Sequence, residues 1–262
     1  MKSLPRRSAE RDGVPLARAL SKLGVMSRTE AARRVLAGDV TVGGRVVRDP
    51  EYPVIPETAR LSVAGDPVAR QAPIVLMLHK PRGVVTTRSD PQGRATVYSL
   101  LDDVRQYVAP VGRLDLASTG LLLLTNDTRF SSWLLDPANA VPRTYILTIR
   151  GELTSESATR IERGIRDRGE LLRATSVEVL KRSTRETHVR VELTEGKNRE
   201  LRRLFAACGH DVTRLKRVTF GGLELGNLAA GQWRIVAPGE LEQAFPGAPN
   251  MRSQRAKGKR QK

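Results

Sequence analysis

The stretch VGRLDLASTGLLLLT, residues 111–125, places one carboxylate in a turn directly before an apolar strand. A strand without polar alternation is buried on both faces, so the loop before it rests on a rigid support. Arg113 lies two residues from Asp115, and a nearby cation favours the ionised carboxylate. The alternative is an ordinary turn aspartate that bonds its own backbone, and the local pattern alone favours that alternative.

The charge of the whole chain favours a polyanionic partner. The 262 residues include 45 Lys and Arg residues against 28 Asp and Glu residues, a net charge of +17, which predicts nucleic acid as the partner. An acidic membrane is disfavoured because no apolar run approaches the roughly 18 residues that a spanning helix needs. Residues 1–13 are charged throughout and lack the apolar centre of a secretory signal. The single cysteine, Cys208, excludes an internal disulfide and fits a reducing cytoplasm.

Residues 14–62 predict a small domain, and a chain of this length has room for about two domains. Apolar residues at near-helical spacing predict a first helix over residues 16–23. A capping box over residues 27–30 opens a second helix. Two short apolar runs around a Gly-Gly turn then predict a hairpin over residues 40–47.

Basic residues lie on the polar side of this small domain. A solvated face is one explanation for scattered cations. The motif SRTEAARRVLAGDVTVGGRVV, residues 27–47, however resembles the S-four RNA-binding domain of ribosomal and RNA-modifying proteins. The resemblance runs from about residue 14 to residue 61 and implies a module that grips RNA phosphates and RNA shape. The basic residues are Lys22, Arg28, Arg33, Arg34, Arg45 and Arg48, and the first candidates for RNA binding are Arg28, Arg33 and Arg34.

The rest of the chain predicts a linker, a larger domain and a tail at each end. Residues 63–73 are rich in Pro, Gly and small residues, which is typical of a linker. Strands outnumber helices over residues 74–245, so we expect an α+β domain with a mostly antiparallel mixed sheet flanked by helices. The predicted elements are strands at 74–78, 84–87, 121–124, 143–149, 177–180, 187–194, 212–220 and 233–236, helices at 130–135, 154–164 and 198–208, and a basic turn at 79–83. Residues 1–13 are predicted as a basic tail and residues 246–262 as a disordered basic tail.

Four segments in one order carry a resemblance to a known enzyme family. They are HKPRG at 79–83, VGRLDLASTGLLLLTND at 111–127, RTYILTI at 143–149 and TEGKNRELRRLFAACGHDVTRLKRVTFGGLELGNLAAG at 194–231. Together they resemble the bacterial ribosomal RNA pseudouridine synthases of the RsuA/RluB type, from about residue 74 to residue 236. The resemblance implies a catalytic domain that isomerises uridine with no metal and no cofactor. Arg199-Glu200 and the turn at 89–94 are more similar to the large-subunit branch.

Three residues would carry the chemistry that the resemblance implies, namely Asp115, Tyr145 and Arg202. Asp115 corresponds to the catalytic aspartate, and Tyr145 to the tyrosine that stacks on the target uracil and is a candidate for proton removal. An ionised carboxylate attacks the substrate, stabilises positive charge on the sugar or removes a sugar proton, and the sequence leaves these roles open. Tyr145 faces inward by the alternation of its strand, where a core residue is the commoner outcome.

Basic residues would position the substrate. Arg202 corresponds to the residue that pairs with the aspartate, with Arg199 and Arg203 as alternative alignments. Arg113 corresponds to the arginine that holds the place of the flipped nucleotide. Taking a base out of its helix costs free energy, and phosphate contacts offset that cost. The residues expected to bind RNA in this domain are Lys80, Arg82, Arg113, Lys197, Arg199 and Arg214.

Competing sites and functions are weaker. His188, Cys208 and His210 lack zinc-ligand spacing, and Cys208 is expected on the buried stripe of its helix, so no metal site is predicted. The preferred function is modification of one uridine in 23S rRNA by a cytoplasmic monomer. The alternatives are the same activity on 16S rRNA and a noncatalytic RNA-binding factor for ribosome assembly. The expected partner is rRNA, free or within a ribosomal subunit or assembly intermediate, and not a membrane.

Overall fold

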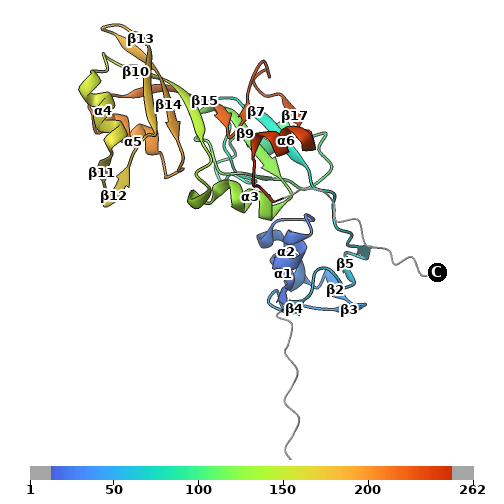
Figure 1. The fold of residues 1–262 in the computed structure, drawn as a ribbon. Helices are drawn as coiled ribbons and strands as arrows, with labels where there is room; N and C mark the ends of the chain where they lie inside the picture. The colour runs from blue at the N-terminus through green and yellow to red at the C-terminus, as the bar shows by residue number, and fades with distance from the viewer. Residues whose placement is uncertain (1–12, 250–262) are drawn as a thin grey trace, which may run out of the picture. The chain divides into compact units, whose positions relative to one another are not determined.

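The computed structural model describes residues 13–249, which divide into two compact units (Figure 1). The first unit consists mainly of the residues up to Pro73 and also includes 106–109 and 126–128. The second unit contains the remaining residues from Ile74 onward. Most of the two predicted tails, namely residues 1–12 and 250–262, lies outside the described residues.

The first unit packs two helices against short strands. Its elements are α1 (Leu16–Lys22), α2 (Arg28–Ala37), β1 (Val14–Pro15), β2 (Val40–Val42), β3 (Arg45–Val46), β4 (Pro53–Val54), β5 (Leu61–Val63) and β6 (Asp66–Pro67). The Ser27 hydroxyl accepts a hydrogen bond from the Glu30 backbone N–H at 3.1 Å, so the predicted start of α2 is confirmed. The Glu30 carboxylate binds Arg33 and Arg34, where a complete capping box would have it bind back to the start of the helix.

The predicted linker, residues 63–73, differs from the structure in its first half. Strands β5 and β6 form an antiparallel hairpin in which Val63 pairs with Asp66. This hairpin extends the sheet β3-β2-β5-β6 of the first unit. Gly, Asp and Pro are typical of tight turns as well as of linkers, so composition alone did not separate the two structures.

A large mixed sheet forms the centre of the second unit, with the strand order β13-β14-β10-β15-β9-β7-β17. Its strands are β7 (Val75–Lys80), β9 (Thr119–Thr125), β10 (Arg143–Arg150), β13 (Ser176–Arg182), β14 (Glu186–Leu193), β15 (Val212–Phe220) and β17 (Trp233–Ile235), with the short β8 (Ala109–Pro110) and β16 (Leu223–Glu224). Neighbours in this order are antiparallel except for β9 with β15. The predicted α+β fold with a mostly antiparallel mixed sheet is therefore confirmed.

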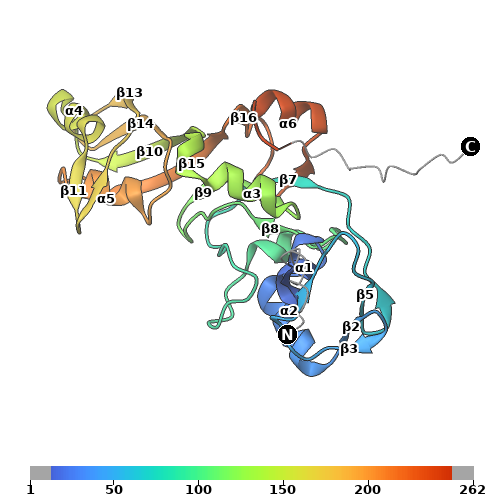
Figure 2. The same cartoon turned by 60° about the horizontal axis from the view of Figure 1, so that its bottom comes forward.

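Helices accompany both ends of this sheet. They are α3 (Thr128–Leu135), α4 (Ser155–Arg163), α5 (Glu200–Ala206) and α6 (Pro238–Ala244), with 3₁₀ turns η1 (Val97–Leu100) and η2 (Pro137–Asn139). Figure 2 shows α4 and α5 near β10, β13 and β14, and α3 and α6 near β7 and β9. Helix α6 and the hairpin of β11 (Ile165–Asp167) with β12 (Glu170–Leu172) were not predicted. Each is too short to show a clear apolar period in the sequence.

Two predicted boundaries near β7 are wrong. The predicted basic turn at 79–83 begins later, because β7 continues to Lys80 and stays paired with β9 to its end. The predicted strand at 84–87 is a loop with a single bridge between Val85 and Thr96. Apolar and β-branched residues are typical of strands, but here Val84 is buried in a loop whose Thr86 hydroxyl donates to the Leu114 carbonyl.

The helix predicted at 198–208 is also shorter than expected, since α5 covers seven residues. Arg199 has a left-handed backbone conformation, with φ of 49°, which prevents the helix from starting earlier. Cys208 lies beyond the last turn and is half-buried, so its predicted place on a buried helical stripe is wrong.

Strand β9 positions the loop that precedes it. Its residues 121–124 are all fully buried, which confirms the prediction from the leucine run. Gly120 pairs with Arg217 of β15, and a Cβ atom at Gly120 would lie 2.1 Å from the Arg217 carbonyl oxygen. Arg217 pairs on its other side with Tyr145 of β10. This register sets the loop with Asp115 beside the strand with Tyr145.

Candidate active site

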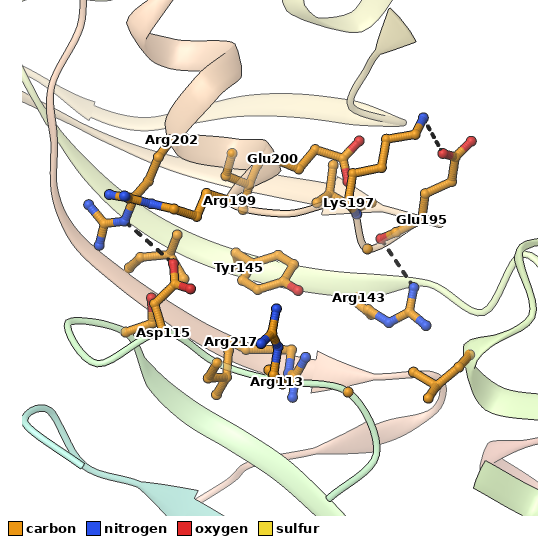
Figure 3. A pocket seen from close by; sticks show the side chains of 18 of the residues that line it. Arg113, Asp115, Arg143, Tyr145, Glu195, Lys197, Arg199, Glu200, Arg202 and Arg217 are labelled. Carbon is orange, nitrogen blue, oxygen red and sulfur yellow. Dashed lines mark hydrogen bonds and ion pairs between the residues drawn. The ribbon is translucent and has the colours of Figure 1, made fainter. Parts of the chain in front are cut away.

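A pocket of about 300 Å³ opens in the second unit beside the start of β9 (Figure 3). It is lined mainly by the loop before β9, by β10, by the segment that leads into α5 and by β15. Its polar lining residues include Arg113, Asp115, Arg143, Tyr145, Glu195, Lys197, Arg199, Glu200, Arg202 and Arg217. The structure therefore brings together Asp115, Tyr145 and Arg202, the three residues expected to carry the chemistry.

Buried Lys80 holds the loop that carries Asp115. Its Nζ donates hydrogen bonds to the backbone carbonyls of Pro81, Asp115 and Ser118 at 3.1, 3.0 and 2.8 Å. The Lys80 side chain is fully buried, so the predicted contact between Lys80 and RNA phosphates is wrong. Burial lowers the pKa of Lys80 to about 8, and the charge of Asp115 opposes that shift. Lys80 is thus a positioning residue for the loop.

A second set of bonds reaches this loop from the segment after β7. The Gly83 N–H donates to the Leu116 carbonyl at 2.9 Å, and the Thr86 hydroxyl donates to the Leu114 carbonyl at 2.8 Å. The backbone on both sides of Asp115 is therefore fixed, while its side chain is 45% exposed at the pocket wall. A fixed backbone with an accessible carboxylate is suited to act on a ligand in the pocket.

Arg202 is the cation beside Asp115. Its Nε lies 3.9 Å from Asp115 Oδ2, and its Nη1 donates to the Val212 carbonyl at 2.7 Å (Figure 3). Burial lowers the pKa of Arg202, and the charge of Asp115 opposes that shift. Within residues 13–249 the Asp115 carboxylate has this ion pair and no hydrogen bond to a backbone N–H. The ordinary turn aspartate is therefore not what the structure contains.

The two alternative partners of Asp115 lie elsewhere. The Arg203 Nε binds Asp167 at 2.5 Å and its Nη1 binds Glu170 at 2.6 Å, so Arg203 faces the hairpin β11-β12. Arg199 lines the pocket, but the ion pair with Asp115 belongs to Arg202. The geometry therefore favours the alignment that assigns Arg202.

Tyr145 lies along the middle of the pocket. Tyr145 is 7% exposed, and Figure 3 shows its ring between Asp115 and Arg143. Its strand neighbours are Val191 on β14 and Arg217 on β15. Tyr145 faces inward, as the alternation of its strand predicts, and the pocket opens against that face. An aromatic ring in this place provides a stacking surface for a base.

Two buried arginines in the pocket wall, Arg143 and Arg217, were missed by the sequence analysis. Arg143 donates to backbone carbonyls of α3 and of the segment after β14, and the Arg217 Nε donates to the Leu121 carbonyl at 2.6 Å. Both guanidinium groups lie over the Phe220 ring, 4.8 and 5.1 Å from its centroid. The available signal was that Arg143 precedes Tyr145 by two residues and so shares its face of β10.

The segment before α5 is held by a buried carboxylate that was also missed. The Lys197 backbone N–H donates to Glu200 Oε2 at 3.0 Å, and burial raises the pKa of Glu200. Lys197 Nζ donates to the Leu171 carbonyl at 2.8 Å and forms an ion pair with Glu195. The Lys197 ammonium, a predicted RNA contact, thus already has protein partners.

The other predicted RNA contacts of the second unit are exposed. Arg113 lines the pocket, while Arg82 and Arg214 line a neighbouring hollow that shares Arg199 and Arg202 with it. Among the described residues, no group of three or more His, Cys, Asp and Glu side chains is placed to hold a metal ion. None of the helices in that part of the chain is long and apolar enough to span a bilayer.

The predicted RNA contacts of the first unit all lie on α2. Arg33 and Arg34 share the Glu30 carboxylate, at 2.6 and 3.0 Å, and Arg34 also approaches Asp39 at 3.6 Å. Arg28 is exposed and has no ion pair within residues 13–249. The three arginines therefore differ in how much of their charge the protein already balances.

Comparisons with known proteins decide the family. A family model described as RNA pseudouridylate synthase matches residues 74–207, over the pocket and most of the large sheet. This chain belongs to the RNA pseudouridylate synthase family. A second model, described as the S4 domain, matches residues 14–58 of the same synthase, so the predicted S-four RNA-binding domain is confirmed.

Relatives of this synthase span nearly its whole length. An uncharacterized RNA pseudouridine synthase of Aquifex aeolicus (strain VF5) is 35% identical over 227 residues, 86% of this chain and 91% of the relative. The ribosomal large subunit pseudouridine synthase B of Bacillus subtilis (strain 168) is 35% identical, with 87% and 93% covered. The ribosomal small subunit pseudouridine synthase A of Escherichia coli (strain K12) is 33% identical, with 84% and 94% covered. The resemblance to the RsuA/RluB type is therefore confirmed.

The fold agrees with this assignment. A solved structure described as a crystal structure of pseudouridylate synthase superposes with a TM-score of 0.63 at 25% sequence identity. The match covers 88% of this chain and 99% of that structure. The predicted class of enzyme, a pseudouridine synthase, is confirmed by the family and by these relatives.

Proposed function

We propose that this pseudouridine synthase modifies one uridine in ribosomal RNA, and that 23S rRNA is the preferred substrate. The names of the Bacillus subtilis and Escherichia coli relatives support ribosomal RNA as the substrate class, one from each subunit. Arg199-Glu200 and the turn at 89–94 support the large-subunit branch. The enzyme would work as a monomer in the cytoplasm, where ribosomes are assembled, and the single Cys208 fits that compartment.

The ion pair of Asp115 with Arg202 inside the pocket is the observation that carries the proposal. The carboxylate is accessible, and its loop is held by hydrogen bonds from Lys80 and Thr86 to the backbone. We assign to Asp115 the action on the substrate that starts the isomerisation, and to Arg202 the orientation of that carboxylate. The half-buried guanidinium also takes the place of water beside Asp115, which limits the positions open to the carboxylate.

The reaction itself needs no second substrate. The bond between the sugar C1′ and the base N1 breaks, the uracil turns and a bond forms between C1′ and C5. The proton on C5 is then removed and N1 carries a proton in the product, so no atom is gained or lost. During these steps the base is detached from the sugar and has to stay in the pocket. Tyr145 would hold it by stacking, and Arg113 at the pocket rim would occupy the gap that the flipped nucleotide leaves.

Release of tritium from rRNA labelled at uracil C5 tests this function. We expect wild-type enzyme to release tritium from unmodified 23S transcripts, and Asp115→Asn to lower the rate by about a thousandfold or more, because an amide cannot act as an anion. Asp103→Asn removes an exposed carboxylate outside the pocket and is the matched control. Full activity of Asp115→Asn would contradict the assignment.

Mapping of pseudouridines in rRNA from cells with and without the protein tests the substrate. Loss of one modification in 23S rRNA would support the preferred substrate, and loss in 16S rRNA would move the enzyme to the small-subunit branch. RNA binding without any change in either rRNA would favour the noncatalytic assembly factor. Comparison of free rRNA with assembly intermediates in the tritium assay would then show which form is recognised.

A further inference from the structure

A second hollow, of about 960 Å³, lies beside the Asp115 pocket on the same unit. Arg199 and Arg202 line both, so the two hollows are neighbours that meet at these side chains. We call this second hollow the arginine groove. Its charged lining residues are Arg82, Arg150, Arg185, Glu186, Arg199, Arg202, His210, Asp211 and Arg214. The lining therefore contains six arginines and only two carboxylates.

The outer arginines of this groove lack carboxylate partners. Arg82, Arg150, Arg185 and Arg214 are exposed, and within residues 13–249 none of their guanidinium groups has an ion pair or a hydrogen bond. Other arginines of the same unit are balanced, as Arg190 is by Glu178 at 2.6 Å, and Arg203 and Arg234 by their own carboxylates. Like charges left unbalanced at one place attract a polyanion and favour its entry.

The groove is built on strand ends rather than on loose loops. The Arg150 N–H donates to the Asp211 carbonyl at 2.9 Å, and the Gly151 N–H donates to the Arg185 carbonyl at 2.8 Å. The His210 Nδ1 lies 3.0 Å from the Arg150 carbonyl oxygen. These bonds tie the end of β10 to the starts of β14 and β15, so Arg150, Arg185 and Arg214 stand on a common rigid frame. Arg82 joins them from the loop after β7.

We propose that the arginine groove binds the phosphates of the RNA strand that continues from the target uridine. The inference rests on the proposed function, because the shared side chains Arg199 and Arg202 place the groove next to the Asp115 pocket, which favours RNA over an acidic protein surface. When a uridine lies at Asp115, its sugar-phosphate backbone would lie near Arg199 and Arg202. The strand would then continue past the four outer arginines of the groove. These contacts position the strand and carry no base sequence.

Charge neutralisation in the groove tests this inference. The triple variant Arg150→Gln, Arg185→Gln, Arg214→Gln removes three phosphate contacts and no pocket residue. We expect binding of unmodified 23S transcript to weaken by about tenfold or more, with a slope of log K against log salt that is shallower by about 2. In turnover, KM should rise by a larger factor than kcat falls, because the contacts hold the strand rather than the reacting atoms.

A matched triple variant separates a local effect from the loss of net charge. The control replaces three exposed arginines of the same unit that lie outside both hollows, by Arg163→Gln, Arg166→Gln and Arg173→Gln. We expect this control to change affinity by less than about threefold and to leave the salt slope nearly unchanged. Equal losses in the two triple variants would overturn the proposal, because the groove would then contribute only general charge.

Shortening the RNA identifies the strand in the groove. RNA fragments are truncated step by step on the 5′ or the 3′ side of the uridine that mapping identifies. If mapping identifies no uridine, each 23S segment that the protein binds is truncated in the same way. On one side only, truncation should weaken wild-type binding and have little further effect on the groove variant. The proposal would be overturned if truncation on both sides weakened the groove variant as much as the wild type, or if the groove variant kept the wild-type salt slope. Either result would favour an acidic protein as the partner of the groove. Wild-type turnover, measured in the same samples, reports separately on the proposed function.

Discussion

The Asp115 pocket and the arginine groove are both rich in cations, but the two regions use them differently. Around the pocket, Lys80, Arg143 and Arg217 are buried and donate to backbone carbonyls. In the groove, Arg150 and Arg185 are exposed and, among the described residues, their guanidinium groups have no partner. A buried cation with carbonyl partners is part of the scaffold, whereas an exposed cation without partners is available to a phosphate. Net charge alone does not distinguish these roles.

Gly120→Ala tests the scaffold side of the comparison and should have the largest effect. A Cβ atom would lie 2.1 Å from the Arg217 carbonyl oxygen, and φ at Gly120 is +109°. We expect loss of soluble folded protein or a fall of about 3–5 kcal/mol in the free energy of unfolding, measured by chemical denaturation. Gly169→Ala shares the positive φ but meets no atom within 4 Å, so it is the control for backbone strain alone. Equal effects of the two changes would contradict the clash.

Lys80→Met tests whether a buried cation positions the catalytic loop. It leaves the Pro81, Asp115 and Ser118 carbonyls without their donor, so we expect a loss of about 2–4 kcal/mol in the free energy of unfolding. In the protein that remains folded, kcat should fall by about tenfold or more while RNA affinity changes by less than about threefold. Lys181→Met removes an exposed cation and should change neither quantity much. A large loss of affinity with normal kcat would assign Lys80 to the RNA-binding cations.

The pH dependence of stability sharpens the same comparison. The pKa of Lys80 is about 8 in the folded protein, below its ordinary value of 10.5. Between these values the unfolded chain keeps the proton and the folded chain loses it, so the Lys80 contribution to the free energy of unfolding rises with pH. Relative to Lys80→Met, wild type should gain about 1–3 kcal/mol from about pH 7 to about pH 10. Denaturation curves of both proteins at several pH values measure it, and parallel pH profiles would show that Lys80 does not titrate there.

The S4 domain offers the smallest test, on two arginines of one helix. Arg28 has no ion pair within the described residues, whereas Arg33 binds Glu30 at 2.6 Å. We expect Arg28→Gln to lower RNA affinity by about two- to fivefold and to make the salt slope shallower by about 0.7–0.9. Arg33→Gln should have a smaller effect, because Glu30 already balances part of that charge. Salt titration of binding measures both, and equal losses would show that the Glu30 pair opens when RNA binds.

Much of the fold could be read from apolar periodicity. The leucine run of β9, the alternation of β10 and the capped start of α2 were all predicted, because each depends on residues close together in the sequence. The start of α5 and the loop at 84–87 were not, because apolar periodicity does not show that Arg199 has a left-handed backbone or that Thr86 bonds the Leu114 carbonyl. The hairpin β5-β6 was taken for a linker because tight turns and linkers share the same residue types.

The candidate site divides in the same way. Its chemical residues, Asp115, Tyr145 and Arg202, stand in recognisable motifs, so the sequence alone pointed to them. The supporting residues Arg217 and Glu200 lie in the quoted segment 194–231, but nothing in that segment marks them as pocket residues, and Lys80 was assigned to the wrong partner. Burial separates a scaffold cation from an RNA contact, and burial depends on strands far apart in the chain.

The amino-acid order alone determined the kind of partner, the two types of domain and the carboxylate at the centre of the chemistry, because charge, periodicity and motifs are local properties. Only the tertiary structure decided which cations are free. The register of β9, β15 and β10 brings Gly120, Arg217 and Tyr145 together. The end of β10 and the starts of β14 and β15 gather Arg150, Arg185 and Arg214. The physical reason is that desolvation and charge balance depend on neighbours in space, which the order of residues does not name.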